Sequence, residues 1–153
     1  MKYYSLNNKT KTISFQEAVI QGLAPDNGLY FPETITPLST SFFDEIENLS
    51  NEEIAFEVIK QFVGNEIPDA ELKNIINETL CFDFPLVSVE ENIYSLELFH
   101  GPTMAFKDVG ARFMSRCLGY FNKNNDKQVT VLVATSGDTG GAVASGFLGV
   151  ENL

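Results

Sequence analysis

Histidine, cysteine and tryptophan are nearly absent from the sequence, which has one histidine, two cysteines and no tryptophan in 153 residues. His100 has no second histidine with which to form a metal site or a catalytic triad. Cys81 and Cys117 stand alone, without the CxxC spacing of zinc sites and redox motifs. The sequence therefore predicts no metal site. The apolar stretches around both cysteines are typical of buried free thiols.

Basic residues are also scarce, with 10 lysines and arginines against 21 aspartates and glutamates, for a formal net charge of -11. A chain this acidic repels nucleic-acid phosphates and anionic membrane surfaces, so we expect neither as a partner. No apolar run approaches the roughly 20 residues that a membrane span requires. The first nine residues lack the apolar core of a secretory signal. We therefore expect a globular protein located in the cytoplasm.

The first half of the chain carries the signals of several helices. Ser14 with Glu17, and Ser50 with Glu53, have the spacing of capping boxes, in which two side chains satisfy free amides at a helix start. Further apolar residues at helical spacing are Phe42, Ile46 and Leu49, followed by Leu72, Ile75, Ile76 and Leu80. Residues 1–84 are predicted to form a small, mostly helical domain.

The pattern changes in the second half. Alternating apolar residues over 86–98 predict a hairpin or two short strands, and apolar residues at steps of three and four predict a helix over 105–122. The apolar, β-branched segment Val129–Ala134 is typical of a strand buried on both faces, and a glycine-rich loop at 135–141 leads into a further helix. This order predicts an α/β domain with parallel strands, and residues 85–153 would hold only its truncated beginning.

Lys107 is predicted to lie in the first turns of the 105–122 helix, where the positive end of the helix dipole disfavours a cation. Its neighbour Asp108 is the residue that this position favours. The dipole and the apolar context of Phe106 would favour the neutral amine that Schiff-base chemistry with an aldehyde needs. The alternative, which the local physics alone favours, is a solvent-facing lysine on an amphipathic helix.

The glycine-rich loop at 135–141 is a second candidate site, because amides at a helix start attract phosphate or carboxylate groups. Its spacing matches neither the mononucleotide nor the dinucleotide motif of glycine-rich loops. The alternative is a tight turn in which Asp138 or Thr139 caps the helix. Arg112 and Arg116 lie one helical turn apart, and we expect them to be solvated or ion-paired.

Three segments of the chain resemble the bacterial and fungal threonine synthases. Residues 98–108, LFHGPTMAFKD, closely resemble the lysine segment of that family. Residues 22–32, GLAPDNGLYFP, resemble its N-terminal signature, and residues 135–140, TSGDTG, resemble its substrate-binding loop. The segments occur in the family's order and extend over the whole chain, which makes the resemblance far more specific than a single short motif.

The resemblance implies a pyridoxal-phosphate enzyme of fold type II, a lyase of threonine biosynthesis that converts O-phospho-L-homoserine and water into L-threonine and phosphate. Lys107 would bind the cofactor covalently and then act as a base. The substrate carboxylate would be held by Ser136, Gly137, Asp138 and Thr139. Asp138 would also approach the ring oxygen of the cofactor, although relatives often carry asparagine there and an ionised carboxylate can only accept hydrogen bonds. The family's cofactor-phosphate loop and ring-nitrogen partner would lie beyond residue 153.

Two other functions stay open. A related phospholyase of fold type II would share the N-terminal signature and would form a 2-oxo acid instead of threonine. Alternatively, the 153 residues would form a binding or regulatory module that kept the motifs without catalysis, although an unfinished sheet argues against independence. If the chain is part of a threonine synthase, we expect the 153 residues alone to be inactive. The sequence carries no signal for the oligomeric state.

Overall fold

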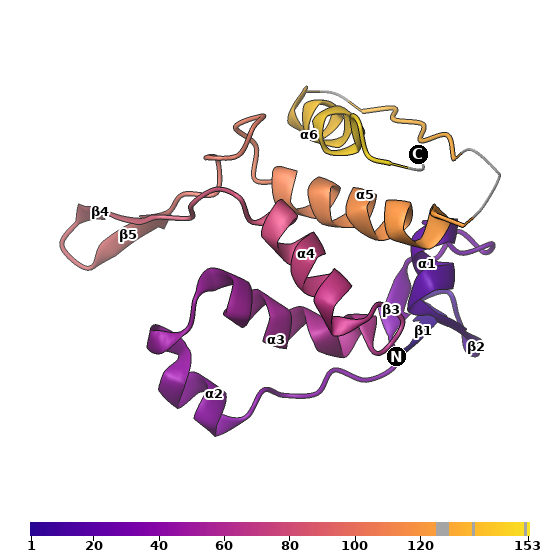
Figure 1. Cartoon of the computed structure of the whole chain (residues 1–153), viewed down its shortest axis with the longest axis horizontal. Coiled ribbons are helices and arrows are strands. Elements are labelled where there is room, and N and C mark those ends of the chain that lie inside the picture. The colour runs from indigo at the N-terminus through magenta and orange to yellow at the C-terminus, as the bar shows by residue number, and fades with distance from the viewer. Residues whose placement is uncertain (125–128, 136, 152) are drawn as a thin grey trace. The chain divides into compact units, whose positions relative to one another are not determined.

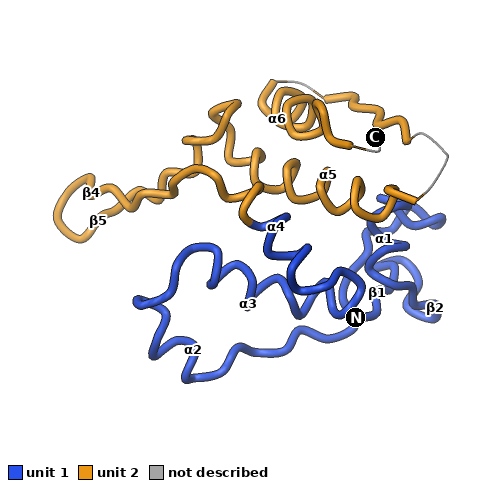
Figure 2. Tube along the Cα trace, viewed as in Figure 1, with its two compact units in different colours: residues 1–76 blue, residues 77–153 orange. Residues whose placement is uncertain are grey.

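The computed structural model describes residues 1–124, 129–135, 137–151 and 153 (Figure 1). These residues form two compact units, residues 1–76 and 77–153 (Figure 2). The division between the units falls inside helix α4 (Asp69–Thr79) and so precedes the change of sequence pattern at residue 85. In the described part of the chain, no helix is long and apolar enough to cross a membrane.

Unit 1 begins with a three-stranded antiparallel sheet that the sequence did not predict. Its strands, in the order β2-β1-β3, are β1 (Lys2–Ser5), β2 (Asn8–Ser14) and β3 (Tyr30–Pro32). Tyr3 in the central strand lies opposite Ile13 on one side and Pro32 on the other. The prediction of a mostly helical first domain is therefore incomplete. β2 is polar and exposed over most of its length, so it lacks the apolar alternation that marks a strand.

The predicted helices of unit 1 are present. They are α1 (Phe15–Gln21), α2 (Thr40–Glu45) with the 3-10 turn η1 (Ile46–Asn48), α3 (Asn51–Val63) and the first part of α4. Both capping boxes are confirmed. The Glu17 amide donates to Ser14 Oγ over 3.1 Å, and the Ser14 amide donates to the Glu17 carboxylate over 2.8 Å. Ser50 and Glu53 form the same pair of bonds, at 3.2 and 2.8 Å.

The most deeply buried apolar side chains of unit 1 are Val63, Ile67 and Leu72, each at most 1% exposed. Tyr3 connects the sheet to α3, because its hydroxyl group donates a hydrogen bond of 2.7 Å to the carbonyl oxygen of Phe62. Burial, with a smaller effect from a nearby carboxylate, raises the pKa of Tyr3 to about 12. The sheet and the longest helix of unit 1 are thus joined through a buried polar contact.

Unit 2 contains an antiparallel hairpin and two packed helices. Its elements after α4 are β4 (Leu86–Glu90), β5 (Ile93–Leu96), α5 (Asp108–Asn122) and α6 (Gly137–Phe147). The hairpin predicted over 86–98 is confirmed, with Leu86 opposite Leu96. α5 and α6 approach closely at Gly146, where an added Cβ atom would lie 3.1 Å from the Cβ atom of Ala111. Glycine at this position lets the two helices pack.

The strand predicted over Val129–Ala134 is wrong. This segment is irregular, and its Leu132 side chain is 89% exposed. Among the residues that the structure describes, every pair of strands is antiparallel, so they form an α/β structure with small sheets and no parallel sheet. A buried parallel strand needs a paired neighbour and cover on both faces. The segment has neither. The following helix starts at Gly137, so most of the predicted 135–141 loop is helical.

Candidate active site

Lys107 lies immediately before α5, in the capping position, and not inside the helix as predicted. Its side chain is half-buried, and its ammonium nitrogen lies 4.3 Å from the centroid of the Phe106 ring. None of the ion pairs among the described residues includes Lys107. The lysine is thus a reachable amine beside an aromatic ring, without a fixed ionic partner.

The loop that leads to Lys107 is held by its own hydrogen bonds. The Met104 amide donates to the Gly101 carbonyl oxygen and the Asp108 amide to the Ala105 carbonyl oxygen, both over 3.0 Å. Met104 has a φ of 56°, a left-handed conformation that residues with a side chain seldom adopt. These contacts give the chain a defined conformation directly before Lys107.

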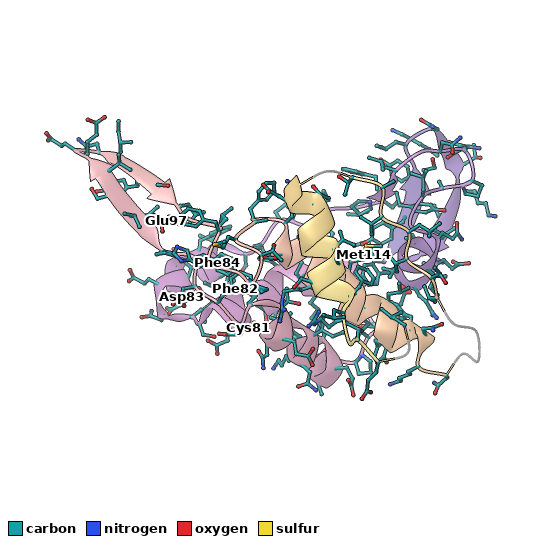
Figure 3. The ribbon with its side chains drawn as sticks, turned by 90° about the horizontal axis from the view of Figure 1, so that it is seen from above. Cys81, Phe82, Asp83, Phe84, Glu97 and Met114 are labelled. Atoms are coloured by element: carbon teal, nitrogen blue, oxygen red, sulfur yellow. The ribbon has the colours of Figure 1, made fainter. Side chains whose placement is uncertain are left out.

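His100, which the sequence analysis left without a partner, forms a pair with Glu97. Its Nε2 atom lies 2.6 Å from Glu97 Oε2, and its ring stacks on Phe99 with centroids 4.9 Å apart. Figure 3 labels Glu97 where the chain leaves the hairpin. The carboxylate fixes the orientation of the imidazole ring, although 40% of the histidine side chain stays exposed. The pairing could not be read from the composition, but the spacing of three residues allowed it.

Three of the four residues predicted to bind the substrate carboxylate lie in the first turn of α6. Gly137 and Asp138 are exposed, and Thr139 is half-buried. Ser136, the fourth, lies outside the described residues. The first amides of a helix have no acceptor within the helix, and the dipole there favours negative charge. The start of α6 is therefore chemically suited to bind an anion. The same dipole stabilises the negative charge of its own acidic residue, Asp138.

The candidate residues that the structure describes lie in two separate segments of unit 2. α5 and α6 meet where Ala111 and Ser115 face Gly146. Among the described residues, no hydrogen bond or ion pair joins Lys107 to the start of α6. The candidate site therefore consists of two parts, the lysine loop just before α5 and the first turn of α6, and these two helices pack against each other.

Arg112 and Arg116 are engaged within unit 2 and are not free for a phosphate group. Arg112 Nη2 donates to the carbonyl oxygen of Glu78 over 2.5 Å and lies 3.2 Å from Cys81 Sγ. Arg116 Nε lies 3.1 Å from a Glu78 carboxylate oxygen, and its Nη1 donates to the Gly146 carbonyl oxygen over 2.9 Å. The predicted ion pairing is thus confirmed for Arg116. Both arginines connect the end of α4 to α5.

The two cysteines differ in exposure. Cys117 on α5 is fully buried, as predicted, and burial raises the pKa of its thiol to about 12. Cys81 is exposed, in contrast to the prediction, and lies just after the end of α4 (Figure 3). Both thiols are free.

A cavity of about 270 Å³ in unit 1 contains none of the predicted site residues. Two pairs of its polar groups are hydrogen-bonded to each other: the Ser5 hydroxyl donates to the Asp26 carboxylate over 2.6 Å, and the Tyr30 hydroxyl donates to Gln21 over 2.5 Å. The bond from Ser5 is the main reason why the pKa of Asp26 lies below its usual value. Within the described part of the chain, no three residues among histidine, cysteine, aspartate and glutamate come together as a metal site.

Comparison with known sequences extends over the whole chain. The family model described as "Threonine synthase N terminus" matches residues 2–80. The chain is 43% identical to threonine synthase from Haemophilus influenzae and 42% identical to threonine synthase from Escherichia coli, each over 153 residues. These matches cover 100% of this chain and 35% of either relative. The chain thus spans about a third of the length of the relatives that it matches.

Solved structures agree with the sequence comparison. The crystal structure of threonine synthase from Escherichia coli superposes with a TM-score of 0.91 at 42% identity, over 99% of this chain and 35% of that one. A structure of threonine synthase from Brucella melitensis with bound pyridoxal phosphate gives a TM-score of 0.92 at 37% identity, over 99% of this chain and 34% of that one. The fold described above is therefore similar to a third of each of these structures.

Proposed function

Because the chain belongs to the family of threonine synthase N-terminal regions, we propose that it is the first third of a threonine synthase. Such an enzyme converts O-phospho-L-homoserine and water into L-threonine and phosphate with pyridoxal phosphate as cofactor. The observation that supports this best is the similarity to two threonine synthases over every residue of the chain. The lysine segment, the N-terminal signature and the glycine-rich segment all lie within that match.

Pyridoxal phosphate fits the chemistry of Lys107. The cofactor's aldehyde needs an amine that a ligand can reach and that no carboxylate holds as an ion pair. Lys107 is half-buried and takes part in none of the ion pairs among the described residues. When bound, the cofactor withdraws electrons from the substrate carbons, which allows phosphate to leave and water to add. Lys107 would hold the cofactor covalently and, once the substrate replaces it, would move protons at its Nζ atom.

The start of α6 would bind the carboxylate of the substrate. The amides of Gly137, Asp138 and Thr139 have no acceptor within the helix and are donors for an anion, and the helix dipole adds to their attraction. Ser136, directly before them in the sequence, belongs to the same proposed site. Asp138 would lie next to the ring oxygen of the cofactor. Lys107 would thus attach the cofactor, and the start of α6 would bind the substrate.

The proposal includes the architecture of the whole enzyme. Residues 1–84 would form the N-terminal domain, and residues 85–153 would begin a catalytic domain of fold type II. Its support is the superposition of 99% of this chain on the Escherichia coli enzyme. We also propose a cytoplasmic location, since free thiols such as Cys81 and Cys117 are typical of a reducing compartment.

Product analysis tests this proposal. The full-length enzyme that carries this chain, loaded with pyridoxal phosphate and given O-phospho-L-homoserine, should release threonine and phosphate in equal amounts. A 2-oxo acid in place of threonine would identify a phospholyase, and the absence of any product would favour a binding module. The 153 residues alone should give no threonine and should bind the cofactor weakly, because the family's cofactor-phosphate loop would lie outside them.

A further inference from the structure

The carboxylate of Asp108, the residue that follows Lys107, is buried and fully engaged. Asp108 is 1% exposed. Its Oδ1 atom accepts a hydrogen bond of 2.6 Å from the Thr103 hydroxyl group, and its Oδ2 atom accepts one of 3.0 Å from the Thr103 amide. Both oxygens therefore bind the same residue, Thr103, in the loop that precedes Lys107.

The space around this carboxylate is filled. A Cβ atom added to Gly101 would lie 2.5 Å from Asp108 Oδ2 and 2.9 Å from Phe82 Cζ, so no side chain fits at that position. The carboxylate thus lies against Gly101. Asp108 packs against the beginning of the loop, at Gly101, and is hydrogen-bonded to its middle, at Thr103.

The loop is strained directly after Thr103. Met104 follows Thr103 with a φ of 56°, and its side chain is 78% exposed, so packing of the side chain does not enforce this conformation. A non-glycine residue stays in the left-handed region only where the surrounding structure holds it there. The bonds from Thr103 to Asp108 and from the Met104 amide to the Gly101 carbonyl oxygen are the contacts that do so.

A buried carboxylate is an unusual way to hold a loop. Removing the charge from water is unfavourable unless hydrogen bonds compensate it, and an apolar residue would pack at lower cost. A position in the first turn of α5 reduces that cost, because the helix dipole favours the negative charge. What the carboxylate adds is a directional link between Thr103 and the residue next to Lys107.

We propose that Asp108 is a positioning residue: through Thr103 and Gly101 it fixes the loop before α5 and thereby the direction in which Lys107 presents its amine. This inference rests on the proposed role of Lys107 as the residue that binds the cofactor. Asp108 itself does not touch the amine in the structure and acts through the backbone. Loss of the link would leave Lys107 at the start of α5 but let the direction of its side chain vary.

Thr103 allows a matched pair of variants. Thr103→Val removes the hydroxyl donor at nearly constant shape and leaves one oxygen of a buried carboxylate without a partner, whereas Thr103→Ser retains the donor. In the 153-residue chain, amide hydrogen exchange at residues 103–108 should be faster in the valine variant and near the wild-type rate in the serine variant. The acylation rate of the Lys107 amine, relative to that of the other lysines, should differ from the wild-type value in the valine variant and stay near it in the serine variant.

The loaded full-length enzyme provides the functional measurement. We expect Thr103→Val to lower both kcat and the rate of borohydride trapping of the cofactor on Lys107 about tenfold, as a lost hydrogen bond to a buried charge predicts. The KM for the substrate should stay within about twofold, since substrate binding is assigned elsewhere. The absorbance band of the lysine-bound cofactor should titrate over a different pH range in the valine variant. Thr103→Ser should restore all of these properties.

The outcomes separate the two proposals. If the wild-type enzyme carries the cofactor on another lysine, the proposed function of Lys107 fails, and this inference fails with it. If the label is on Lys107 but the valine variant matches the wild type in trapping rate, spectrum and Lys107 acylation, only the positioning role is overturned. Asp108→Ala, which removes both bonds, should exceed the effect of Thr103→Val, and a smaller effect would also overturn that role.

Discussion

The hydroxyl group of Ser115 on α5 donates a hydrogen bond of 2.7 Å to the carbonyl oxygen of Gly146 on α6, and the guanidinium group of Arg116 donates to the same oxygen over 2.9 Å. Ser115 is fully buried at this contact. The bond joins the helix that follows the candidate lysine to the helix that carries the candidate substrate-binding turn. The distance between the two parts of the site therefore depends on how closely these helices pack.

Replacement of Gly146 tests that packing. In Gly146→Ala the added Cβ atom would lie 3.0 Å from the carbonyl carbon of Ala111 and 3.1 Å from its Cβ atom, so the helices must move apart. We expect a loss of about 1–3 kcal/mol in the free energy of unfolding, the range for overpacked cores. Gly141→Ala on the same helix is the control. Nothing lies within 4 Å of its added Cβ atom, and alanine should stabilise the helix by up to about 1 kcal/mol. Denaturant titration of both variants measures the difference, and equal stabilities would contradict this packing argument.

Covalent labelling tests the assignment of Lys107. Borohydride reduction of the loaded full-length enzyme should fix the cofactor on the peptide that contains Lys107, and Lys107→Ala should abolish turnover. Lys123, at the other end of α5, is a matched control, because its ammonium nitrogen also lies 4.3 Å from an aromatic centroid, that of Tyr120. Lys123→Ala should keep both label and activity. Mass spectrometry locates the label, and its presence on any other lysine would refute the assignment.

Replacement of Asp138 should weaken substrate binding more than cofactor binding. We expect Asp138→Ala to raise the KM for O-phospho-L-homoserine about tenfold or more while the bound cofactor is retained, because the cofactor's phosphate would be held elsewhere. Asp138→Asn keeps the shape and restores a hydrogen-bond donor, so it should be much milder. Steady-state kinetics and cofactor absorbance separate the two effects. An enzyme that loses its cofactor but retains its KM would show that this division is wrong.

The two thiols should differ strongly in reactivity. At pH 8 a thiol reagent should modify the exposed Cys81 and leave Cys117 untouched, because Cys117 is fully buried and burial raises its pKa to about 12. Reactivity follows the thiolate, so raising the pH toward 10 should still leave Cys117 protonated in the folded chain. Denaturant should expose it and lower its pKa to the usual value near 8.5. Peptide mapping after alkylation measures this, and early modification of Cys117 in the folded chain would contradict its burial.

Local signals in the sequence predicted local structure well. The capping boxes at Ser14 and Ser50 form as expected, because each involves side chains only three residues apart. The hairpin over 86–96 was predicted for the same reason: its two strands are adjacent in the sequence. The pairing of Arg116 with an acidic residue was expected in kind, but its partner, Glu78, was not identifiable at such a separation.

Features that depend on distant partners were missed or wrong. The sheet of unit 1 pairs β1 with β3, which lies after α1, and β2 has no apolar alternation. No local sequence pattern therefore predicted this sheet. The segment 129–134 has the composition of a buried strand. A strand also needs neighbouring strands to pair with, and the composition of one segment does not show whether they are present. Lys107 was placed inside a helix because apolar spacing runs through it. The helix begins later, at Asp108, after the turn that this residue holds, and a side chain's bond to Thr103 leaves no mark in the periodicity.

The exposed apolar side chains of unit 2 have a consequence for biosynthesis. Leu86 and Val89 on β4, and Leu132 near α6, are 65%, 65% and 89% exposed. If this chain is the first third of a threonine synthase, it leaves the ribosome before the rest of the enzyme exists. At roughly 5–20 residues per second, completing a protein of the relatives' length would take tens of seconds more. During that interval we expect these exposed side chains to be accessible to chaperones, and the nascent chain should depend on chaperones more than the finished enzyme does.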